Sequence, residues 1–359
     1  MVSSSNTPIR VLIVEDSTVC RELLISIFQT SPDFEVVGVA RNGLEGLRLA
    51  KRIMPDVITM DVFMPHMDGY QATQQIMEQY PCPIVMVTNR LHRGANQLTF
   101  NALQAGALSI IHKPTVNDPP ASFQQLLQQV RLMAELRVVR RRPLSTRSPA
   151  AVEAARQSEM PALKADRSHP QLSVKVVVMA ASTGGPTALA HILGDLPADF
   201  PVPIFVVQHI TAGFETGFVK WLNNKTDLTV RSAEAKQWPR AGEVWLAPEG
   251  HYLVVDQQGY LILKKRVMGP GPGQAADHLF AAVAQVYGRQ AIGVILTGMG
   301  RDGAAGLHAM HQTGAYTIAQ NEESSVIFGM PAAAIQLGAA SQVQPLTNIA
   351  GTIMDLLWE

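Results

Sequence analysis

Residues 174–186, Val-Lys-Val-Val-Val-Met-Ala-Ala-Ser-Thr-Gly-Gly-Pro, decide the fold of the C-terminal half, because an apolar run ends there at a serine and two glycines. We predict a buried strand, then a turn that exposes the Ser182 hydroxyl, then a helix. Glycines let backbone amides approach a substrate closely, and a helix N-terminus favours negative charge. A nucleophile and an anion-stabilising pocket fit this pattern, and so does a plain turn or a phosphate-binding loop.

Two further apolar runs of the C-terminal half end at polar residues. Residues 202–207 run into His209, and residues 291–296 run into a glycine-rich loop that contains Asp302. Because ligands of open parallel sheets bind outside the carboxyl ends of the strands, we expect these groups to meet. A hydroxyl, an imidazole and a carboxylate are the parts of a nucleophile, a general base and an orienting acid. Their chain order, Ser-His-Asp, differs from that of the common α/β-hydrolases, whose Gly-x-Ser-x-Gly pattern is also absent here.

Length and composition describe an ordinary globular protein of two domains. The chain has 359 residues, 47% hydrophobic and 16% charged, with a formal net charge of zero. Such a balance gives no indication of nucleic-acid binding, and no apolar run is long enough for membrane insertion. The two cysteines, Cys20 and Cys82, lack metal-ligand spacing and predict no disulfide framework. Together with the absence of a signal-peptide pattern, this predicts a cytoplasmic protein.

Strand and helix patterns alternate through the N-terminal half. Apolar strand-like runs occupy 10–14, 35–40, 56–60, 84–87 and 108–111. Asn42 is placed to cap a helix over 43–53, and a last helix is expected over 122–139. Repeated strand–helix units predict an α/β fold with a doubly wound parallel sheet.

The second half repeats this alternation after a change of composition. Residues 140–172 are rich in Arg, Pro, Ser and Ala, which is typical of a linker. From there we predict a second doubly wound parallel-sheet domain. It contains a β-hairpin insertion, formed by residues 243–247 and 252–255 with 260–263, between its second and third parallel strands.

The strand ends of the N-terminal half collect a second set of polar residues on one sheet edge. These are Glu15, Asp16, Asp61, Thr88 and Lys113. Three carboxylates supply hard oxygen ligands for Mg²⁺, with Asp61 placed to attack a phosphoryl group. Lys113 offsets charge on the transferred oxygens and the Thr88 hydroxyl binds one of them. Each residue alone would be an ordinary polar strand end, whereas all five together predict a phosphorylation site.

The N-terminal half resembles a response-regulator receiver domain, a flavodoxin-like fold. The motifs that carry the resemblance are Val14-Glu15-Asp16-Ser17, Asp61 to Gly69, Ala105-Gly106-Ala107 and Lys113-Pro114. It implies that Asp61 is the phosphoacceptor and that a sensor histidine kinase is the phosphodonor. Two positions depart from the usual pattern: Ile110 stands where many receivers have Phe or Tyr, and Phe63 replaces an acidic residue.

The C-terminal half resembles the catalytic domain of the chemotaxis methylesterase, a Rossmann-like fold. The matching motifs are Ala181 to Pro186, Gln208-His209, Ala247 to His251, Leu296 to Ala304 and Phe328 to Pro331. With the receiver in front, the resemblance gives a receiver at 8–139, a linker at 140–172 and a catalytic domain at 173–359. It implies hydrolysis of glutamate methyl esters, and deamidation of glutamines, on methylated chemoreceptors.

The resemblance and the chemistry assign the same catalytic roles. Ser182 attacks the ester, His209 takes its proton, and Asp302 orients the imidazole. The backbone amides of Thr183 and Met299 are the candidate oxyanion donors, and this domain needs no cofactor. Residues 269–276 depart from the family pattern, because Gln274-Ala275-Ala276 replaces Arg-Pro-Ser before Asp277.

Two alternatives remain at this point. One keeps the hydrolase but directs it to receptors of a non-flagellar chemosensory pathway, which the divergent 269–276 segment favours. The other is a non-catalytic phospho-signalling adaptor, which the intact Ser-His-Asp set disfavours. We also expect autoinhibition, in which the receiver covers the Ser182 cleft until phosphorylation changes its docking face.

Overall fold

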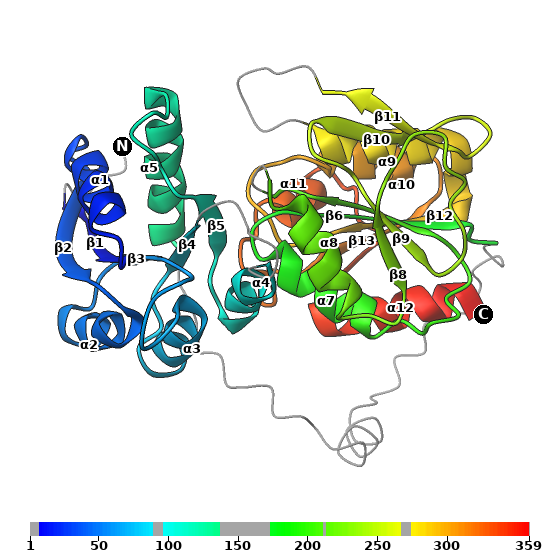
Figure 1. Ribbon diagram of the computed structural model, residues 1–359. Coiled ribbons are helices and arrows are strands. Elements are labelled where there is room, and N and C mark those ends of the chain that lie inside the picture. The colour runs from blue at the N-terminus through cyan, green and yellow to red at the C-terminus, as the bar shows by residue number, and fades with distance from the viewer. Residues whose placement is uncertain (1–6, 89–95, 137–172, 211–212, 267–273, 359) are drawn as a thin grey trace, which may run out of the picture.

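The computed structural model describes residues 7–88, 96–136, 173–210, 213–266 and 274–358. These residues form two α/β domains that lie side by side, as Figure 1 shows. The predicted linker over 140–172 lies outside the described residues, as does most of the divergent 269–276 segment.

The N-terminal domain is a parallel sheet of five strands in the order β2-β1-β3-β4-β5. This is the flavodoxin-like order. Its strands are β1 (Ile9–Val14), β2 (Phe34–Ala40), β3 (Val57–Met60), β4 (Ile84–Thr88) and β5 (Ser109–His112). Its helices are α1 (Thr18–Gln29), α2 (Gly43–Ile53), α3 (Gly69–Gln79), α4 (Asn96–Ala105) and α5 (Pro120–Ala134).

Alternation along the strands sends side chains into two cores. Leu12 and Val14 of β1 belong to one hydrophobic cluster, and Val11 and Ile13 belong to another on the opposite face. The predicted cap of α2 is confirmed, because Asn42 Oδ1 accepts a hydrogen bond from the Glu45 amide at 2.9 Å. The last helix begins two residues before the predicted start, since Pro119 and Pro120 suit a helix N-terminus.

The C-terminal domain has a sheet of seven parallel strands in the order β14-β13-β12-β6-β7-β9-β8. They are β6 (Val176–Ala181), β7 (Ile204–Gln208), β8 (Thr229–Ser232), β9 (Glu243–Leu246), β12 (Ala291–Ile295), β13 (Tyr316–Gln320) and β14 (Gln342–Gln344). The helices are α7 (Gly185–Gly194), α8 (Glu215–Asn223), α9 (Ala275–Tyr287), α10 (Ala304–Gln312), α11 (Met330–Gln336) and α12 (Leu346–Trp358), and the 3₁₀ helix η1 (Gly288–Gln290) precedes β12.

Both faces of this sheet are covered, so the predicted doubly wound architecture is confirmed. Val177 and Met179 of β6 join the cluster that includes α7 and α12, whereas Val176 and Val178 join the cluster of α9, α10 and α11. The chain starts at the central strand β6, builds one side of the sheet through β7, and returns to build the other side from β12. The strand order therefore switches between β6 and β12, where open α/β sheets bind ligands.

The predicted hairpin is only partly right. Residues 251–255 (β10, His251–Val255) and 261–265 (β11, Leu261–Lys265) do form an antiparallel pair. Residues 243–246, however, form β9, which pairs in parallel with β7 and β8 inside the main sheet. Three of its four residues are buried, a continuous pattern that suits a strand covered on both faces rather than an exposed hairpin arm.

The two domains contact each other through α4, which packs on α7 and α8 (Figure 1). The Phe100 ring lies 5.5 Å from the Phe218 ring and 5.6 Å from the Trp221 ring, centroid to centroid. The Trp221 indole donates a hydrogen bond to Asn101 at 3.2 Å. One hydrophobic cluster therefore runs from the N-terminal domain into the C-terminal domain.

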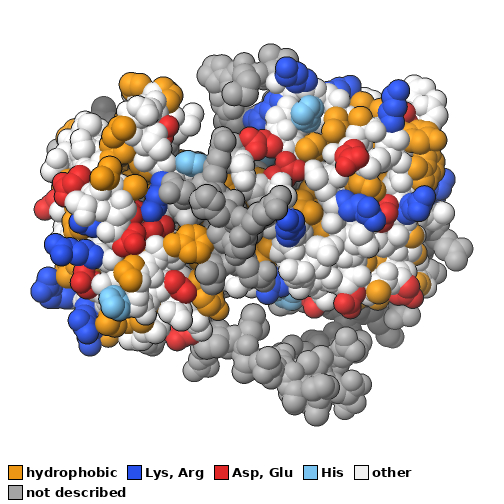
Figure 2. Space-filling view, viewed as in Figure 1, with side chains coloured by type: hydrophobic (Ala, Val, Ile, Leu, Met, Phe, Trp, Pro, Cys, Tyr) orange, Lys and Arg blue, Asp and Glu red, His pale blue; other side chains and the backbone are white. Residues whose placement is uncertain are grey.

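The surface carries both signs of charge. On the face drawn in Figure 2, acidic and basic side chains are interspersed over both lobes. Within the described residues, no helix has the length and apolar character needed to cross a bilayer.

Candidate functional sites

The carboxyl ends of three adjacent strands position the predicted catalytic residues. The His209 amide donates to the Ala181 carbonyl at 3.0 Å, which fixes the end of β7 beside the end of β6. The Ser182 amide donates to the Thr297 carbonyl at 3.0 Å, which does the same for β12. The sequence prediction that these strand ends meet at one edge is thus observed directly.

The imidazole and the carboxylate of the predicted set form a close pair. His209 Nε2 lies 2.7 Å from Asp302 Oδ2, and the Asp302 side chain is buried. Burial alone would raise the pKa of the Asp302 carboxyl, but the bond and charge of His209 and two backbone amides hold it below its ordinary value. The carboxylate therefore remains ionised, which keeps a proton on Nε2 and leaves Nδ1 as the nitrogen that can accept one.

Ser182 lies in the same cavity as His209. This cavity has a volume of about 530 Å³, and its walls include Ser182, Thr183, His209, Met299 and Gly300. Among the described residues, no hydrogen bond joins the Ser182 hydroxyl to His209. Such contacts are often loose without substrate and tighten in the reacting complex.

The N-terminal domain supplies part of this cavity. Ser109 of β5 and Gln129, Leu132 and Met133 of α5 line it opposite the catalytic residues. The cavity therefore lies between the domains.

Two backbone amides at the cavity are free to bind an anion. Neither the Thr183 amide nor the Met299 amide has a hydrogen-bond acceptor within the described part of the chain. Thr183 precedes α7, whose N-cap Gly184 has a φ of 78°, in the left-handed region that glycine enters without strain. Both residues predicted as oxyanion donors thus line the cavity, and their amides have no acceptor within the described residues.

Gln208 is a residue whose role the sequence did not indicate. Its side-chain amide donates to the Ser182 carbonyl at 2.9 Å and to the His209 carbonyl at 2.8 Å. A Cβ at Gly185 would lie 2.1 Å from Gln208 Oε1, so the glycine makes room for this side chain. Gln208 ties the nucleophile's turn to the base's strand end. In the sequence, the only indication of a role for Gln208 was its position next to His209 in a matching motif.

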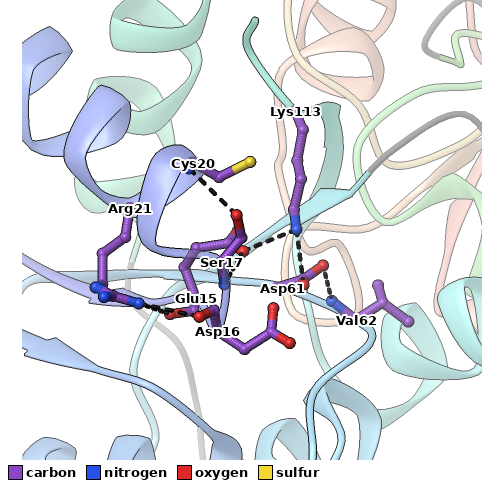
Figure 3. A network of polar contacts seen from close by, with 8 residues as sticks. All are labelled: Glu15, Asp16, Ser17, Cys20, Arg21, Asp61, Val62 and Lys113. Atoms are coloured by element: carbon purple, nitrogen blue, oxygen red, sulfur yellow. Dashed lines mark hydrogen bonds and ion pairs between the residues drawn. The ribbon is translucent and has the colours of Figure 1, made fainter.

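Four of the five residues predicted for the N-terminal site lie together in Figure 3: Glu15, Asp16, Asp61 and Lys113. Lys113 Nζ lies 2.7 Å from Asp61 Oδ2 and 2.9 Å from Glu15 Oε1. Ligand oxygens of Glu15, Asp16 and Asp61 all lie within 4.8 Å of one another. Thr88 ends the neighbouring strand β4, and its carbonyl accepts a bond from the Lys113 amide at 2.9 Å.

Burial and the ion pairs of Lys113 set the pKa values at this site. Burial, with the charge of Asp61, raises the pKa of Glu15 to about 7. Burial also raises the pKa of Asp61, despite its bond to Lys113. For Lys113, burial acts to lower the pKa, but the bonds to Asp61 and Glu15 outweigh it and the pKa is raised. The ammonium therefore stays charged between the two carboxylates.

These residues fit a divalent cation. Three carboxylates provide the hard oxygen ligands that Mg²⁺ prefers. Glu15 Oε2 is buried without a hydrogen-bond partner, which leaves it available to an ion. Of the two departures from the receiver pattern, Ile110 is buried and Phe63 is 42% exposed beside the site.

Comparison with known proteins identifies both halves. Residues 177–353 match the CheB methylesterase family, and residues 11–123 match the response regulator receiver domain. A protein from Nitrosospira multiformis, named protein-glutamate methylesterase/protein-glutamine glutaminase, is 43% identical, covering 98% of this chain and 98% of its own. A protein from Syntrophus aciditrophicus, named protein-glutamate methylesterase/protein-glutamine glutaminase 1, is 42% identical, covering 97% of this chain and 98% of its own.

Among solved structures, the chain is similar to the Thermotoga maritima CheB methylesterase catalytic domain. The identity is 36%, the coverage 51% of this chain and 98% of that one, and the TM-score 0.49. The two relatives that match nearly the whole chain at 42–43% identity, and the two domain families matched in this chain, agree on the family. The chain belongs to the CheB methylesterase family, as a hydrolase that carries a response regulator receiver domain in front of its methylesterase domain.

Proposed function

We propose that the chain hydrolyses glutamate methyl esters of chemoreceptors, and deamidates receptor glutamines, through Ser182, His209 and Asp302. The observation that carries this proposal is the 2.7 Å contact between His209 and a buried Asp302, together with the cavity that both His209 and Ser182 line. Both cysteines are free, as is usual in the reducing cytoplasm, where we place the reaction.

In the first half-reaction, Ser182 Oγ attacks the ester carbonyl carbon while His209 Nδ1 takes the hydroxyl proton. The negative charge then on the carbonyl oxygen is stabilised by the amides of Thr183 and Met299. The C–O bond to the methoxy group breaks, and His209 returns the proton so that methanol leaves. In the second half-reaction, water attacks the acyl-serine by the same route and releases the glutamate carboxyl. Asp302 keeps the imidazole oriented and stabilises its charged form.

Phosphorylation of Asp61 by a sensor histidine kinase forms the regulatory part of the proposal. Glu15, Asp16 and Asp61 would hold Mg²⁺, which would offset charge on the phosphoryl oxygens. Lys113 is already bonded to Asp61 and is within reach of the same oxygens. Thr88, at the end of the adjacent strand, would donate its hydroxyl to one of them.

The receiver restrains the enzyme until Asp61 is phosphorylated. In support, α5 and β5 of the receiver line the cavity that holds Ser182. A helix with its side chains is about 10–12 Å across, so we expect that the receiver has to move before a receptor helix reaches Ser182. The domains proposed are the receiver at 8–139, the linker at 140–172 and the catalytic domain at 173–359.

The decisive experiment is Ser182→Ala, assayed by methanol release from methylated receptor membranes. We expect loss of turnover by several orders of magnitude, since no other group supplies the nucleophile, with folding and phosphorylation intact. Ser109→Ala is the matched control, because it removes another hydroxyl from the same cavity on the receiver side. Methanol release by Ser182→Ala at the wild-type rate refutes the covalent mechanism, and no release by the phosphorylated wild type favours an adaptor.

A further inference from the structure

Two helices beside the catalytic residues lack caps of their own. The N-cap residue of α9 is Gln274 and that of α10 is Gly303, and neither makes a side-chain capping bond. The first amides of a helix have no partner within it, and buried amides need an acceptor. Both helix starts lie next to Asp302, which precedes α10 by two residues.

Each helix takes its cap from the other. The Asp302 carboxylate accepts hydrogen bonds from the amides of Ala276 and Asp277 in the first turn of α9, both at 3.0 Å. In return, Asp277 Oδ1 accepts one from the Gly306 amide in the first turn of α10 at 2.7 Å. The amides of Gly303 and Ala305 also donate toward Asp277. The two aspartates are therefore reciprocal caps of adjacent helices.

Close packing makes this arrangement rigid. A Cβ added at Gly306 would lie 2.7 Å from the Asp277 carbonyl oxygen, so the two helices touch through backbone. Asp302 is only 8% exposed, and burial, with the charge of Asp302 contributing, raises the pKa of Asp277. Two carboxylates that repel each other are held in place by the positive ends of two helices.

We infer that Asp277 is a positioning residue for catalysis, because its bonds to the start of α10 fix the carboxylate of Asp302 against His209. Asp302 Oδ2 accepts from both His209 and the Ala276 amide, so a displacement of α10 against α9 would pull it from the imidazole. This inference rests on the proposed Ser-His-Asp mechanism. It assigns a role to Asp277, the acidic residue that directly follows the divergent 269–276 segment.

A double-mutant cycle in the full-length enzyme tests the inference. We expect Asp277→Ala to lower kcat roughly 10- to 100-fold with little change in KM, because misplacing a catalytic group slows the chemical step. Asp277→Asn keeps an oxygen acceptor for the Gly306 amide and should restore kcat to within about 3-fold of wild type. In an Asp302→Asn background, Asp277→Ala should cost no more than about 2-fold, because the charge to be positioned is already gone.

The control is Asp256→Ala, which also removes an aspartate that accepts two backbone amides, those of Gln258 and Tyr260, in the β10–β11 turn. It should leave kcat unchanged. Wild-type kcat in Asp277→Ala, or an equal loss in both backgrounds, overturns the positioning role. If Asp302→Asn itself has wild-type kcat, the proposed mechanism fails instead. If Asp277→Ala does not fold, the cycle is run with Asp277→Ser, and equal losses there also overturn the inference.

Discussion

Lys113 shows how a single residue links chemistry to regulation. Its ammonium holds two buried carboxylates, those of Glu15 and Asp61, which would otherwise repel each other. A phosphoryl group on Asp61 adds negative charge at this point and draws Lys113 toward the new oxygens. Lys113 directly follows β5, the strand that begins at Ser109 in the wall of the catalytic cavity. Strand β5 thus connects Lys113, which binds Asp61, with Ser109, which lines the Ser182 cavity.

At this scale we predict that Asp61→Asn abolishes phosphoryl uptake. The amide is a poor nucleophile and removes one of the three carboxylates of the cation site. Labelling with a small phosphodonor in the presence of Mg²⁺ should give no stable label, and methylesterase activity should stay at the unphosphorylated level. Asp56→Asn is the control, since Asp56 binds the Arg10 amide near the opposite end of β3. Label retained by Asp61→Asn at another residue would contradict the assignment.

At the scale of elements, α4 is the main contact between the domains. Phe100 inserts its ring beside Phe218 and Trp221 of α8, and Thr187 of α7 donates to the Leu103 carbonyl at 3.3 Å. These contacts bury aromatic side chains, which supply much of the free energy of such interfaces. Strand β4 ends at Thr88, and α4 is the next element in the chain. The candidate phosphorylation site and the docking helix are therefore close in sequence.

We predict that Asn101→Ala raises the activity of the unphosphorylated enzyme. It removes the hydrogen bond from the Trp221 indole across the interface. A bond worth about 0.5–1.5 kcal/mol changes the docking equilibrium by roughly 2- to 10-fold, and the methanol release rate should rise by a similar factor. Gln74→Ala, on the exposed face of α3, is the control. An unchanged rate in Asn101→Ala would mean that α4 docking does not limit activity.

The elements that the sequence predicted correctly are those with local signals. Buried strands that end in polar residues, and a capped helix at Asn42, depend on neighbouring residues alone. Residues 243–246 were assigned to the hairpin because their partners β7 and β8 could not be recognised from spacing. The sequence named Asp277 and Gln208 but did not predict their roles, since their partners include backbone groups of distant segments. The docking of α4 depends on aromatic residues more than 100 positions away.

At the scale of the whole molecule, the described part of the receiver has a second contact with the catalytic domain. Besides the α4 contact, Ile327 is buried in the receiver's hydrophobic cluster, with Val326 and Met299 packed against it. The Gly298 amide donates to the Ile327 carbonyl at 3.0 Å, which ties this contact to the loop of the candidate oxyanion donor. On the proposed mechanism, we expect docking of the receiver to affect the Met299 loop as well as access to Ser182.

Autoinhibition predicts that a fragment of residues 173–359 is faster than the unphosphorylated full-length chain on the same methylated receptor membranes. Removing the receiver removes the cavity wall formed by Ser109, Gln129, Leu132 and Met133. Interfaces within one chain are modest, roughly 600–1,500 Å², and couplings of about 1–3 kcal/mol correspond to roughly 5- to 150-fold, the range in which we expect the increase.

The comparison with the phosphorylated full-length enzyme separates the two contacts. If the receiver only blocks access, the fragment and the phosphorylated enzyme should release methanol at equal rates. If the contact at Ile327 also orders the Met299 loop, the phosphorylated enzyme should exceed the fragment, because the fragment lacks the surface that supports the loop. A fragment no faster than the unphosphorylated chain would contradict autoinhibition, and the receiver would then act by positive activation alone.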